Sequence, residues 1–295
     1  MALRIAIVGP GRVGTAFAAR FVQAGATFVG FVGRSADAVS RQVAAVGAGK
    51  SLQWSDLASV HVVIFAVGDA DLSAAVREAA AIGGRPCSLW LHTSGRHGLD
   101  VFAPAQPLGV RIGSLHPVMP FSGPVEDLQM RGAPAVLAGE QRSMRLLKRL
   151  AVMLELDAIE WLGDVGATGR SLYHAGCALA ANGATALFGK SVDLIRAAGG
   201  LSADEGAAIV GALMQAAARS ATQNGAAAAL SGPVRRGDAE TVAMHLEAIQ
   251  KATPEAGPSY VALMQLALIL AREQGLPAAD CERVAAALSL LRPQS

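Results

Sequence analysis

The chain has 295 residues, of which 52% are hydrophobic and 16% are charged, and its formal net charge is +2. This length suits two domains, and the high hydrophobic content excludes a disordered chain. No run of basic residues exceeds two, as at Arg235-Arg236. We therefore expect no nucleic-acid partner.

The three cysteines, Cys87, Cys177 and Cys281, are far apart and form no CxxC pair. We expect neither a disulfide framework nor a zinc site, and we expect a reducing, cytoplasmic location. The stretch Ser171–Gly189 carries no charge but contains polar residues such as Asn182, which are costly in lipid. It predicts a buried helix of a soluble protein, with no membrane partner.

The first half of the chain alternates short β-branched runs with helical patterns, which is typical of βαβ units and of a parallel sheet covered on both faces. The predicted strands span residues 4–8, 27–33, 60–66, 88–92, 111–114 and 135–138. Each is nearly continuous in apolar residues, as a strand buried on both faces requires.

The pattern changes around Asp157–Gly163, and from there alanine-rich helical periodicity reaches the end of the chain. We place the domain boundary between residues 163 and 164. Ser202 followed by Glu205 predicts a capping box at the start of one helix. The predicted helices span residues 164–198, 202–224, 238–251, 258–274 and 277–291.

A glycine-rich run, GPGRVG, directly follows the first predicted strand and precedes an amphipathic helix. In this context Gly9 permits the tight turn, Gly11 lets the backbone approach a pyrophosphate, and Gly14 lets the helix pack on the sheet. Arg12 and Val13 begin the helix, whose N-terminus supplies unpaired N–H groups. The Arg12 side chain is a further candidate for binding phosphate, the alternative being that it lies on the surface. The alternative for the whole run is a tight turn that binds nothing. The pattern predicts an α/β fold, a Rossmann doubly wound parallel sheet in residues 1–163, followed by an all-α domain in residues 164–295.

The end of the second predicted strand decides which nicotinamide cofactor is preferred, because an acidic residue there binds the ribose 2′-hydroxyl of NAD. This chain has Arg34 and Ser35 instead, a guanidinium and a hydroxyl that suit a 2′-phosphate. We therefore expect NADP, the alternative being that Arg34 is a solvated loop cation. Val67 and Gly68, after the next buried strand, are expected to approach the cofactor through their backbone.

These motifs resemble a superfamily that contains β-hydroxyacid dehydrogenases, pyrroline-5-carboxylate reductases and ketopantoate reductases. The chain is most similar to members that pair a Rossmann-like domain with a C-terminal domain of unknown function. The resemblance rests on the glycine loop and on residues 33–35, 92–95, 113–117, 173–182 and 230–238. It implies an N-terminal NADP-binding domain, a helical second domain and a homodimer built on the helices.

The resemblance also implies a catalytic Lys four residues before Asn182, but Ala178 stands there. Because histidine exchanges protons near neutral pH, we expect His116, in a loop after a strand, to take this part. Asn182 is expected to bind a substrate oxygen, and His174 or Tyr173 to relay a proton, on neighbouring faces of one helix about 80° apart. The alternative for His116 is a loop histidine hydrogen-bonded to the backbone. The alternative for Asn182 is a hydrogen bond between two helices.

Two loops are candidates for binding a substrate carboxylate. Ser94 and Gly95, after a strand, offer a hydroxyl and backbone N–H groups. Ser94 is also a candidate catalytic residue. Ser231 and Arg235 lie before a later helix, where arginine matches carboxylate geometry, although a plain solvated loop fits as well. His92 is expected to be a packed histidine.

No HExxH, CxxC pair or acidic calcium loop occurs, so we expect no metal. The sequence predicts an NADP-dependent oxidoreductase that transfers hydride to or from a small keto, hydroxy or imino acid bearing a carboxylate. One alternative is a ketopantoate- or prephenate-like specificity. Another is a non-catalytic NADP-binding sensor or interaction protein.

Overall fold

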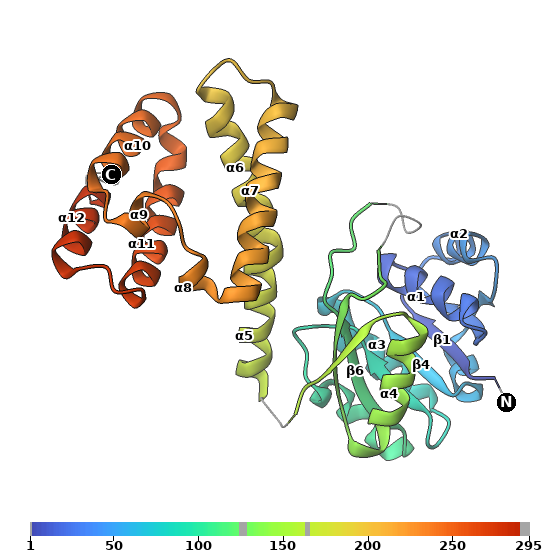
Figure 1. The fold of residues 1–295 in the computed structure, drawn as a ribbon. Coiled ribbons are helices and arrows are strands. Elements are labelled where there is room, and N and C mark those ends of the chain that lie inside the picture. The colour runs from blue at the N-terminus through green and yellow to red at the C-terminus, as the bar shows by residue number, and fades with distance from the viewer. Residues whose placement is uncertain (1, 124–128, 163–165, 290–295) are drawn as a thin grey trace. The chain divides into compact units, whose positions relative to one another are not determined.

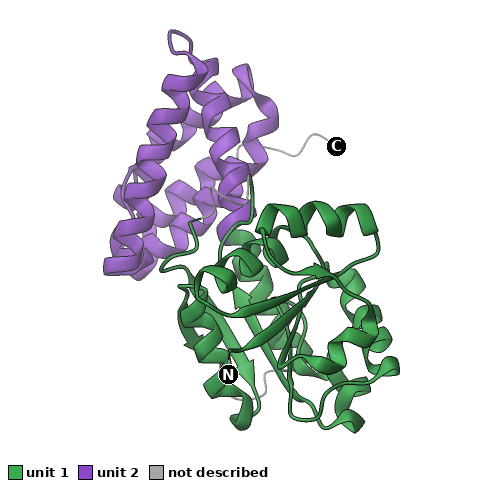
Figure 2. Ribbon diagram, turned by 90° about the vertical axis from the view of Figure 1, so that its right-hand side faces the viewer, with its two compact units in different colours: residues 1–179 green, residues 180–295 purple. Residues whose placement is uncertain are grey.

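The computed structural model describes residues 2–123, 129–162 and 166–289, and its contacts divide the chain into two compact units, residues 1–179 and 180–295 (Figure 2). The predicted boundary between residues 163 and 164 lies outside the described residues. Helix α5 (Gly166–Ala178) belongs to the first unit. Its side chains Arg170 and Tyr173 bond to a strand of that unit, which explains why the contacts divide the chain later than the sequence pattern does.

The first unit is built on one eight-stranded sheet with the order β3-β2-β1-β4-β5-β6-β7-β8. Figure 1 labels β1, β4 and β6 of this sheet. The strands are β1 (Arg4–Val8), β2 (Thr27–Val32), β3 (Lys50–Ser51), β4 (Val62–Phe65), β5 (Leu89–His92), β6 (Arg111–Pro117), β7 (Pro134–Gly139) and β8 (Asp157–Glu160). All neighbouring pairs are parallel except β6 and β7, which are antiparallel. The predicted parallel, doubly wound class is confirmed, with this one reversal.

Helices cover both faces of the sheet. The helical segments of this unit before α5 are α1 (Arg12–Gln23), α2 (Ala36–Val46), η1 (Trp54–Ser59), α3 (Asp69–Ile82), η2 (Leu99–Leu108) and α4 (Gln141–Met153). On one face Phe17 of α1, Leu147 of α4 and Ile7 of β1 belong to one buried hydrophobic cluster. On the other, Leu72 of α3 and Phe102 of η2 pack with Val8 and other strand residues. Burial of β1 on both faces accounts for its unbroken apolar sequence.

The second unit is helical, as predicted. The chain leaves α5 through a π-helical turn at Leu179–Gly183. Then follow α6 (Ala184–Ala197), α7 (Ala203–Asn224), α8 (Ala226–Ala229), α9 (Pro233–Arg236), α10 (Ala239–Ala252), η5 (Pro254–Ala256), α11 (Gly257–Glu273) and α12 (Ala278–Leu288). Three predicted helices agree with α7, α10 and α11 to within one residue at each end. The predicted ends at Asp164 and Leu291 lie outside the described residues.

The start of α7 confirms the predicted capping box: Ser202 Oγ accepts the Glu205 amide, and the Glu205 carboxylate accepts the Ser202 amide. The core of this unit lies around α10, α11 and α12, with Val242, Leu268 and Val284 among its buried residues. None of the helices in the described ranges combines the length and hydropathy needed to cross a bilayer.

Candidate functional site

A cavity of about 470 Å³ lies where the carboxyl ends of β1, β2 and β4 meet, the usual ligand position in such sheets. Most of the residues predicted to bind a cofactor line it. They are Gly9, Gly11, Arg34, Ser35, Val67 and Gly68. Arg12, Val13 and Gly14 do not line it and instead form the first turn of α1.

The three glycines of the loop have different surroundings. Gly9 has a φ of +103°, and a Cβ there would lie 2.5 Å from the Ala66 carbonyl oxygen; a Cβ on Gly14 would lie 2.2 Å from the Gly9 carbonyl oxygen. Gly11, by contrast, has no atom within 4 Å of its Cβ position. It is also the N-cap of α1 and provides no side-chain cap. The loop therefore leaves open space in front of free helix amides, which is what a pyrophosphate requires.

Arg34 and Ser35 directly precede the first residue of α2. The Ser35 hydroxyl accepts the Ala38 amide at 3.3 Å and so caps this helix. Arg34 pairs with Asp71 at 3.2 Å, but its side chain is 89% exposed. An ion pair this exposed contributes only about 0–1 kcal/mol, so the guanidinium remains available to a phosphate.

A second group of polar side chains, here called the strand-end cluster, comprises His92, Ser114, His116, Arg170 and Tyr173. His92 ends β5 and pairs with Ser114 of β6, and α5 contributes the arginine and the tyrosine. His116 Nδ1 and Tyr173 Oη are 2.7 Å apart, and Arg170 Nη2 donates to Ser114 Oγ at 3.4 Å. The two residues of the first contact are 57 positions apart in the sequence, and those of the second are 56 apart.

The prediction that His116 lies in a loop is wrong, because β6 continues to Pro117 by pairing with β7. A Cβ on Gly95 would lie 2.8 Å from His116 Nε2, so this glycine leaves room for the imidazole. Burial lowers the pKa of His116 to about 4, assisted by His174 and Arg170. The imidazole is therefore neutral at pH 7.

Ser94 bonds within its own loop, its hydroxyl oxygen accepting the amides of Arg96 and His97, each at 3.1 Å. His92 is packed as predicted: it is fully buried and stacks on Phe102. Burial lowers the pKa of His92 to about 3. These contacts hold the β5 loop in shape.

Asn182 does not have the predicted helical relation to His174. The π-helical turn at Leu179–Gly183 interrupts the α-helix between them, so the 80° offset no longer applies. Asn182 is exposed within the second unit, whereas His174 is half-buried in the first. Ser231 and Arg235 are also in the second unit. Ser231 is exposed and precedes α9, whereas Arg235 is half-buried and lies within α9.

Arg170 was not among the predicted site residues. Its side chain is only 4% exposed, and its guanidinium carbon lies 4.5 Å from the centre of the Trp161 ring. Nη1 is buried and has no hydrogen-bond acceptor among the described residues. One feature of the sequence could have indicated Arg170 as a site residue. It is the charged residue that immediately precedes the uncharged stretch Ser171–Gly189.

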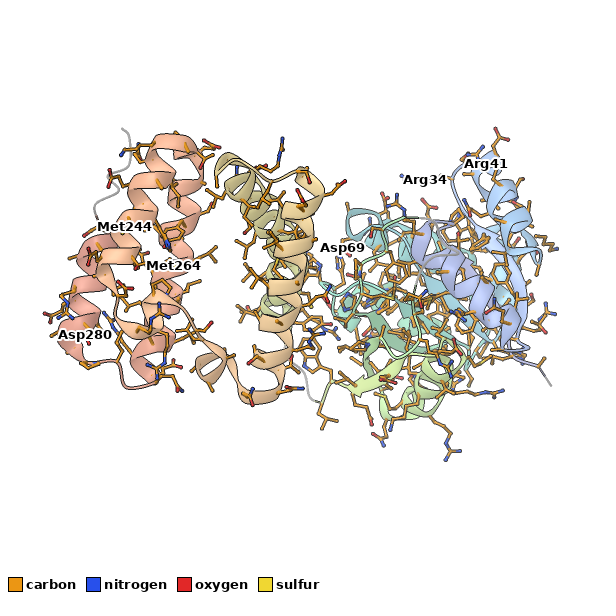
Figure 3. The ribbon with its side chains drawn as sticks, turned by 45° about the horizontal axis from the view of Figure 1, so that its top comes forward. Arg34, Arg41, Asp69, Met244, Met264 and Asp280 are labelled. Carbon is orange, nitrogen blue, oxygen red and sulfur yellow. The ribbon has the colours of Figure 1, made fainter. Side chains whose placement is uncertain are left out.

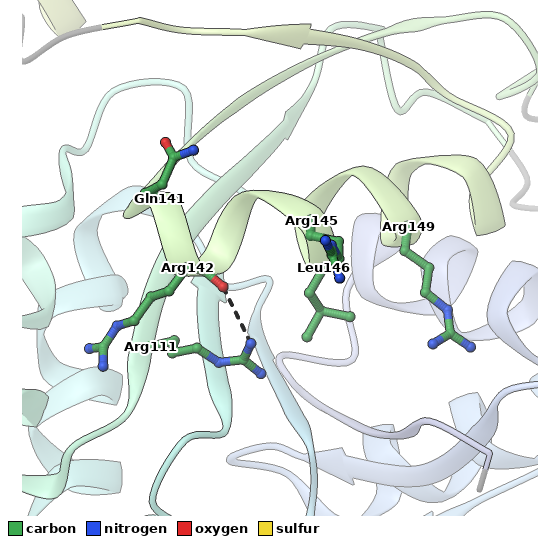
Figure 4. Close-up of a pocket in the computed structure, with 6 residues that line it drawn as sticks. All are labelled: Arg111, Gln141, Arg142, Arg145, Leu146 and Arg149. Carbon is green, nitrogen blue, oxygen red and sulfur yellow. Dashed lines mark hydrogen bonds between the residues drawn. The ribbon is translucent and has the colours of Figure 1, made fainter.

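Another cavity, of about 540 Å³, runs along α4 and is rich in arginine (Figure 4). Its lining consists of Arg111, Gln141, Arg142, Arg145, Leu146 and Arg149. Arg111 is the first residue of β6, so this cavity lies at the amino end of that strand. The cavity of about 470 Å³ at the carboxyl ends of β1, β2 and β4 is a separate one, and we call it the nucleotide pocket because most of the residues predicted to bind the cofactor line it. Substitutions of the arginines of the cavity along α4 therefore serve as controls for substitutions in the strand-end cluster.

Solved structures share this fold over nearly the whole chain. Protein BF3122 of Bacteroides fragilis has a TM-score of 0.68 and 17% identity, over 92% of this chain and 97% of that chain. An imine reductase of Streptomyces aurantiacus has a TM-score of 0.63 and 15% identity, over 95% and 99%. A reductive aminase of Aspergillus terreus, in complex with NADPH and ethyl levulinate, has a TM-score of 0.61 and 20% identity, over 98% and 93%.

No curated protein matches the sequence. Two family profiles do: a Rossmann-like domain covers residues 1–117, and Domain of unknown function (DUF2520) covers residues 133–286, more than half of the chain. The match to residues 133–286 includes the strand β7, the helix α5 and most of the second unit. The chain therefore belongs to the DUF2520 family, whose helical domain here follows a Rossmann-like domain.

Proposed function

We propose that the protein is an NADP-dependent oxidoreductase acting on the C=O, CH–OH or C=N group of a small acid. The observation that carries the proposal is the open nucleotide pocket with Gly11 at its helix N-terminus, in the same unit as the His116–Tyr173 pair. The similar folds of a reductive aminase in complex with NADPH and of an imine reductase support it.

Residues of the pocket would hold the cofactor in two ways. The free amides at the start of α1 would bind the pyrophosphate, and the open space at Gly11 would leave room for it. Arg34 and Ser35 suit a 2′-phosphate on the adenosine ribose. When bound, NADPH supplies the hydride.

The His116–Tyr173 pair would supply or remove the proton. Burial raises the pKa of Tyr173, so its hydroxyl keeps its proton, and the neighbouring imidazole is neutral. In the reductive direction Tyr173 Oη–H donates to the developing alkoxide or amine, while His116 Nδ1–H donates to the phenolic oxygen and stabilises its charge. In the oxidative direction the same atoms take the proton back.

Cofactor preference provides a direct test. We expect NADPH to bind more tightly than NADH, and Arg34→Ala to weaken NADPH binding by about 10- to 100-fold, because a hydrogen bond to a charged group contributes about 1.5–3 kcal/mol. NADH binding should change less than twofold. Fluorescence titration measures both affinities. Arg41→Ala, which removes another exposed arginine from the same unit (Figure 3), is the control; equal affinities of the unaltered protein for the two cofactors contradict NADP preference.

A non-catalytic NADP sensor is the second candidate, and Ala178 at the position expected for a lysine favours it. A panel of keto and imino acids with NADPH, followed by loss of absorbance, separates the two. Turnover of any acid supports the enzyme. Tight NADPH binding with no turnover across the panel supports the sensor.

We further propose a homodimer formed through the second unit. Within this unit α6 has no buried residue and α7 has only Gly206 and Val210, while Leu213 is 64% exposed. Exposed apolar side chains on paired helices fit a second copy of the same chain. Sedimentation at micromolar concentration should give twice the chain mass, and Leu213→Glu should give monomer whereas Gln215→Glu should not. A monomeric unaltered protein contradicts the proposal.

A further inference from the structure

Arg170 is a buried cation, 4% exposed, that forms no ion pair with a carboxylate in the part of the chain that the structure describes. One guanidinium nitrogen, Nη2, donates to the Ser114 hydroxyl, and the other, Nη1, is buried without an acceptor. Removing a charge from water without pairing it costs free energy, and unpaired buried groups of this kind are rare in folded proteins.

The neighbours of Arg170 do not neutralise it. His92 and His116 carry no charge at pH 7, because burial and the arginine itself lower their pKa values. The Trp161 ring stacks on the guanidinium, and the Tyr173 ring packs edge-on to that indole at 4.8 Å between centroids. The result is a positive, hydrogen-bond-donating site walled by aromatic rings.

We propose that Arg170 binds the carboxylate of the substrate, so that the substrate class is a small 2-oxo or 2-imino acid. The guanidinium matches a carboxylate with parallel N–H···O bonds, and Nη1 is the donor that lacks a partner. The identity of the substrate rests on the proposed oxidoreductase function; the anion site does not.

The position of Arg170 beside the proton pair explains this choice of acid. Arg170 and Tyr173 are three residues apart on α5 and so lie on one side of the helix. Their partners Ser114 and His116 are two apart on β6 and so lie on one face of the sheet. A carboxylate on Arg170 would therefore place the carbon bonded to it on the same side of α5 as Tyr173 Oη, which could protonate a 2-oxo or 2-imino group there.

Trp161 would control access to this site. It is half-buried, whereas the guanidinium that it stacks on is buried. An anion reaches Nη1 when the indole moves aside. Binding should therefore change the fluorescence of Trp161, and Trp161→Phe should remove that change.

The test uses pyruvate and its uncharged amide, pyruvamide, added to the full chain without cofactor. Calorimetry and the fluorescence change should show pyruvate binding, with pyruvamide at least 10-fold weaker. Arg170→Met should weaken pyruvate binding at least 10-fold, and Arg145→Met, at an exposed arginine of the same unit, should leave it within twofold.

Thermal unfolding separates this role from a structural one. Arg170→Met removes a buried charge that has no ion-pair partner among the described residues, so its melting temperature without ligand should equal or exceed that of the unaltered protein, and pyruvate should no longer raise it. A lower melting temperature with unchanged pyruvate binding overturns the proposal. So does failure of the unaltered protein to bind pyruvate. If Arg170→Met does not fold, the Trp161→Phe result decides, since a fluorescence change that persists without this indole also overturns it.

Failure of the oxidoreductase proposal gives a different pattern. Pyruvate binding that depends on Arg170, in a protein that binds neither NADPH nor NADH, keeps the anion site and removes the enzyme. NADPH binding and turnover that survive Arg170→Met remove the anion site and keep the enzyme.

Discussion

Gly11→Ala should lower NADPH affinity by roughly 100-fold and leave the fold intact, whereas Gly14→Ala should unfold the first unit at a lower temperature. The contrast follows from what each new methyl group meets. At Gly11 no protein atom lies within 4 Å, so the methyl occupies the space that a pyrophosphate needs. Losing hydrogen bonds to that charged group costs about 3 kcal/mol.

At Gly14 the methyl would lie 2.2 Å from the Gly9 carbonyl oxygen and 3.1 Å from Ile7 Cγ2. The helix must move away from β1, and overpacking of this kind costs about 1–3 kcal/mol. Gly11→Ala changes only an N-cap residue and should cost about 1 kcal/mol or less.

Fluorescence titration and thermal unfolding, applied to both variants, measure these effects. An affinity for NADPH that Gly11→Ala leaves unchanged contradicts the assignment of the nucleotide pocket. Gly25→Ala is unsuitable as a control because Gly25 has a φ of +76°. Gly176→Ala suits, because Gly176 lies within α5 and a Cβ there meets no atom within 4 Å.

Tyr173→Phe should reduce turnover by about 10²- to 10⁴-fold, the usual contribution of a positioned acid or base. The phenyl ring keeps the packing against Trp161 and removes only the hydroxyl that contacts His116 Nδ1. The Michaelis constant for NADPH should stay within twofold, since the nucleotide pocket does not include this residue. Steady-state kinetics on any acid that turns over provides the measurement. A rate unchanged in Tyr173→Phe removes the tyrosine from the mechanism.

The pH dependence of stability tests the surroundings of the same pair. His116 is faced by Tyr173, His174 and Arg170 of α5 and by Asp69 at the start of α3. Its pKa is about 4 in the folded protein, against 6.5 for a solvated histidine, so the unfolded chain binds more protons between these values. The free energy of unfolding therefore rises with pH from about 4 to 6.5, by up to about 1.4 kcal/mol per pH unit from this residue.

His116→Asn should remove that part of the slope and leave the part due to His92, whose pKa is about 3. Denaturant unfolding at a series of pH values measures the slope. A slope that is the same in His116→Asn contradicts a neutral, half-buried His116.

The sequence predicts the buried strands well because they carry an unambiguous apolar pattern. β1 is predicted without error, and the ends of β4 and β5 differ by at most two residues. β3 and β8 were not predicted, because Lys50–Ser51 is short and both strands are exposed at every residue. Pairing with β7 lengthens β6 beyond its predicted end, and no local pattern in residues 111–117 announces a partner some twenty residues later.

The nucleotide pocket and the strand-end cluster also differ in how far the sequence predicts them. The cavity at the ends of β1, β2 and β4 depends on local turns, so the GPGRVG run and Arg34 already indicate residues that line it. The contact between His116 and Tyr173 spans 57 residues, and that between Arg170 and Ser114 spans 56. Such contacts depend on where α5 packs, which periodicity does not specify. The π-helical turn before Asn182 likewise has no signature in an alanine-rich run.

The nucleotide pocket uses residues between Val8 and Glu78, whereas the strand-end cluster is complete only when α5 packs on β6. During synthesis the first set leaves the ribosome well before the second. The two also share no residue, so mutations can accumulate in α5 without altering the residues proposed to bind the cofactor. If the proposed roles hold, descendants of one ancestral chain can keep the same cofactor while exchanging Arg170 and Tyr173 for groups that suit other substrates, which gives this architecture a simple route to diversify.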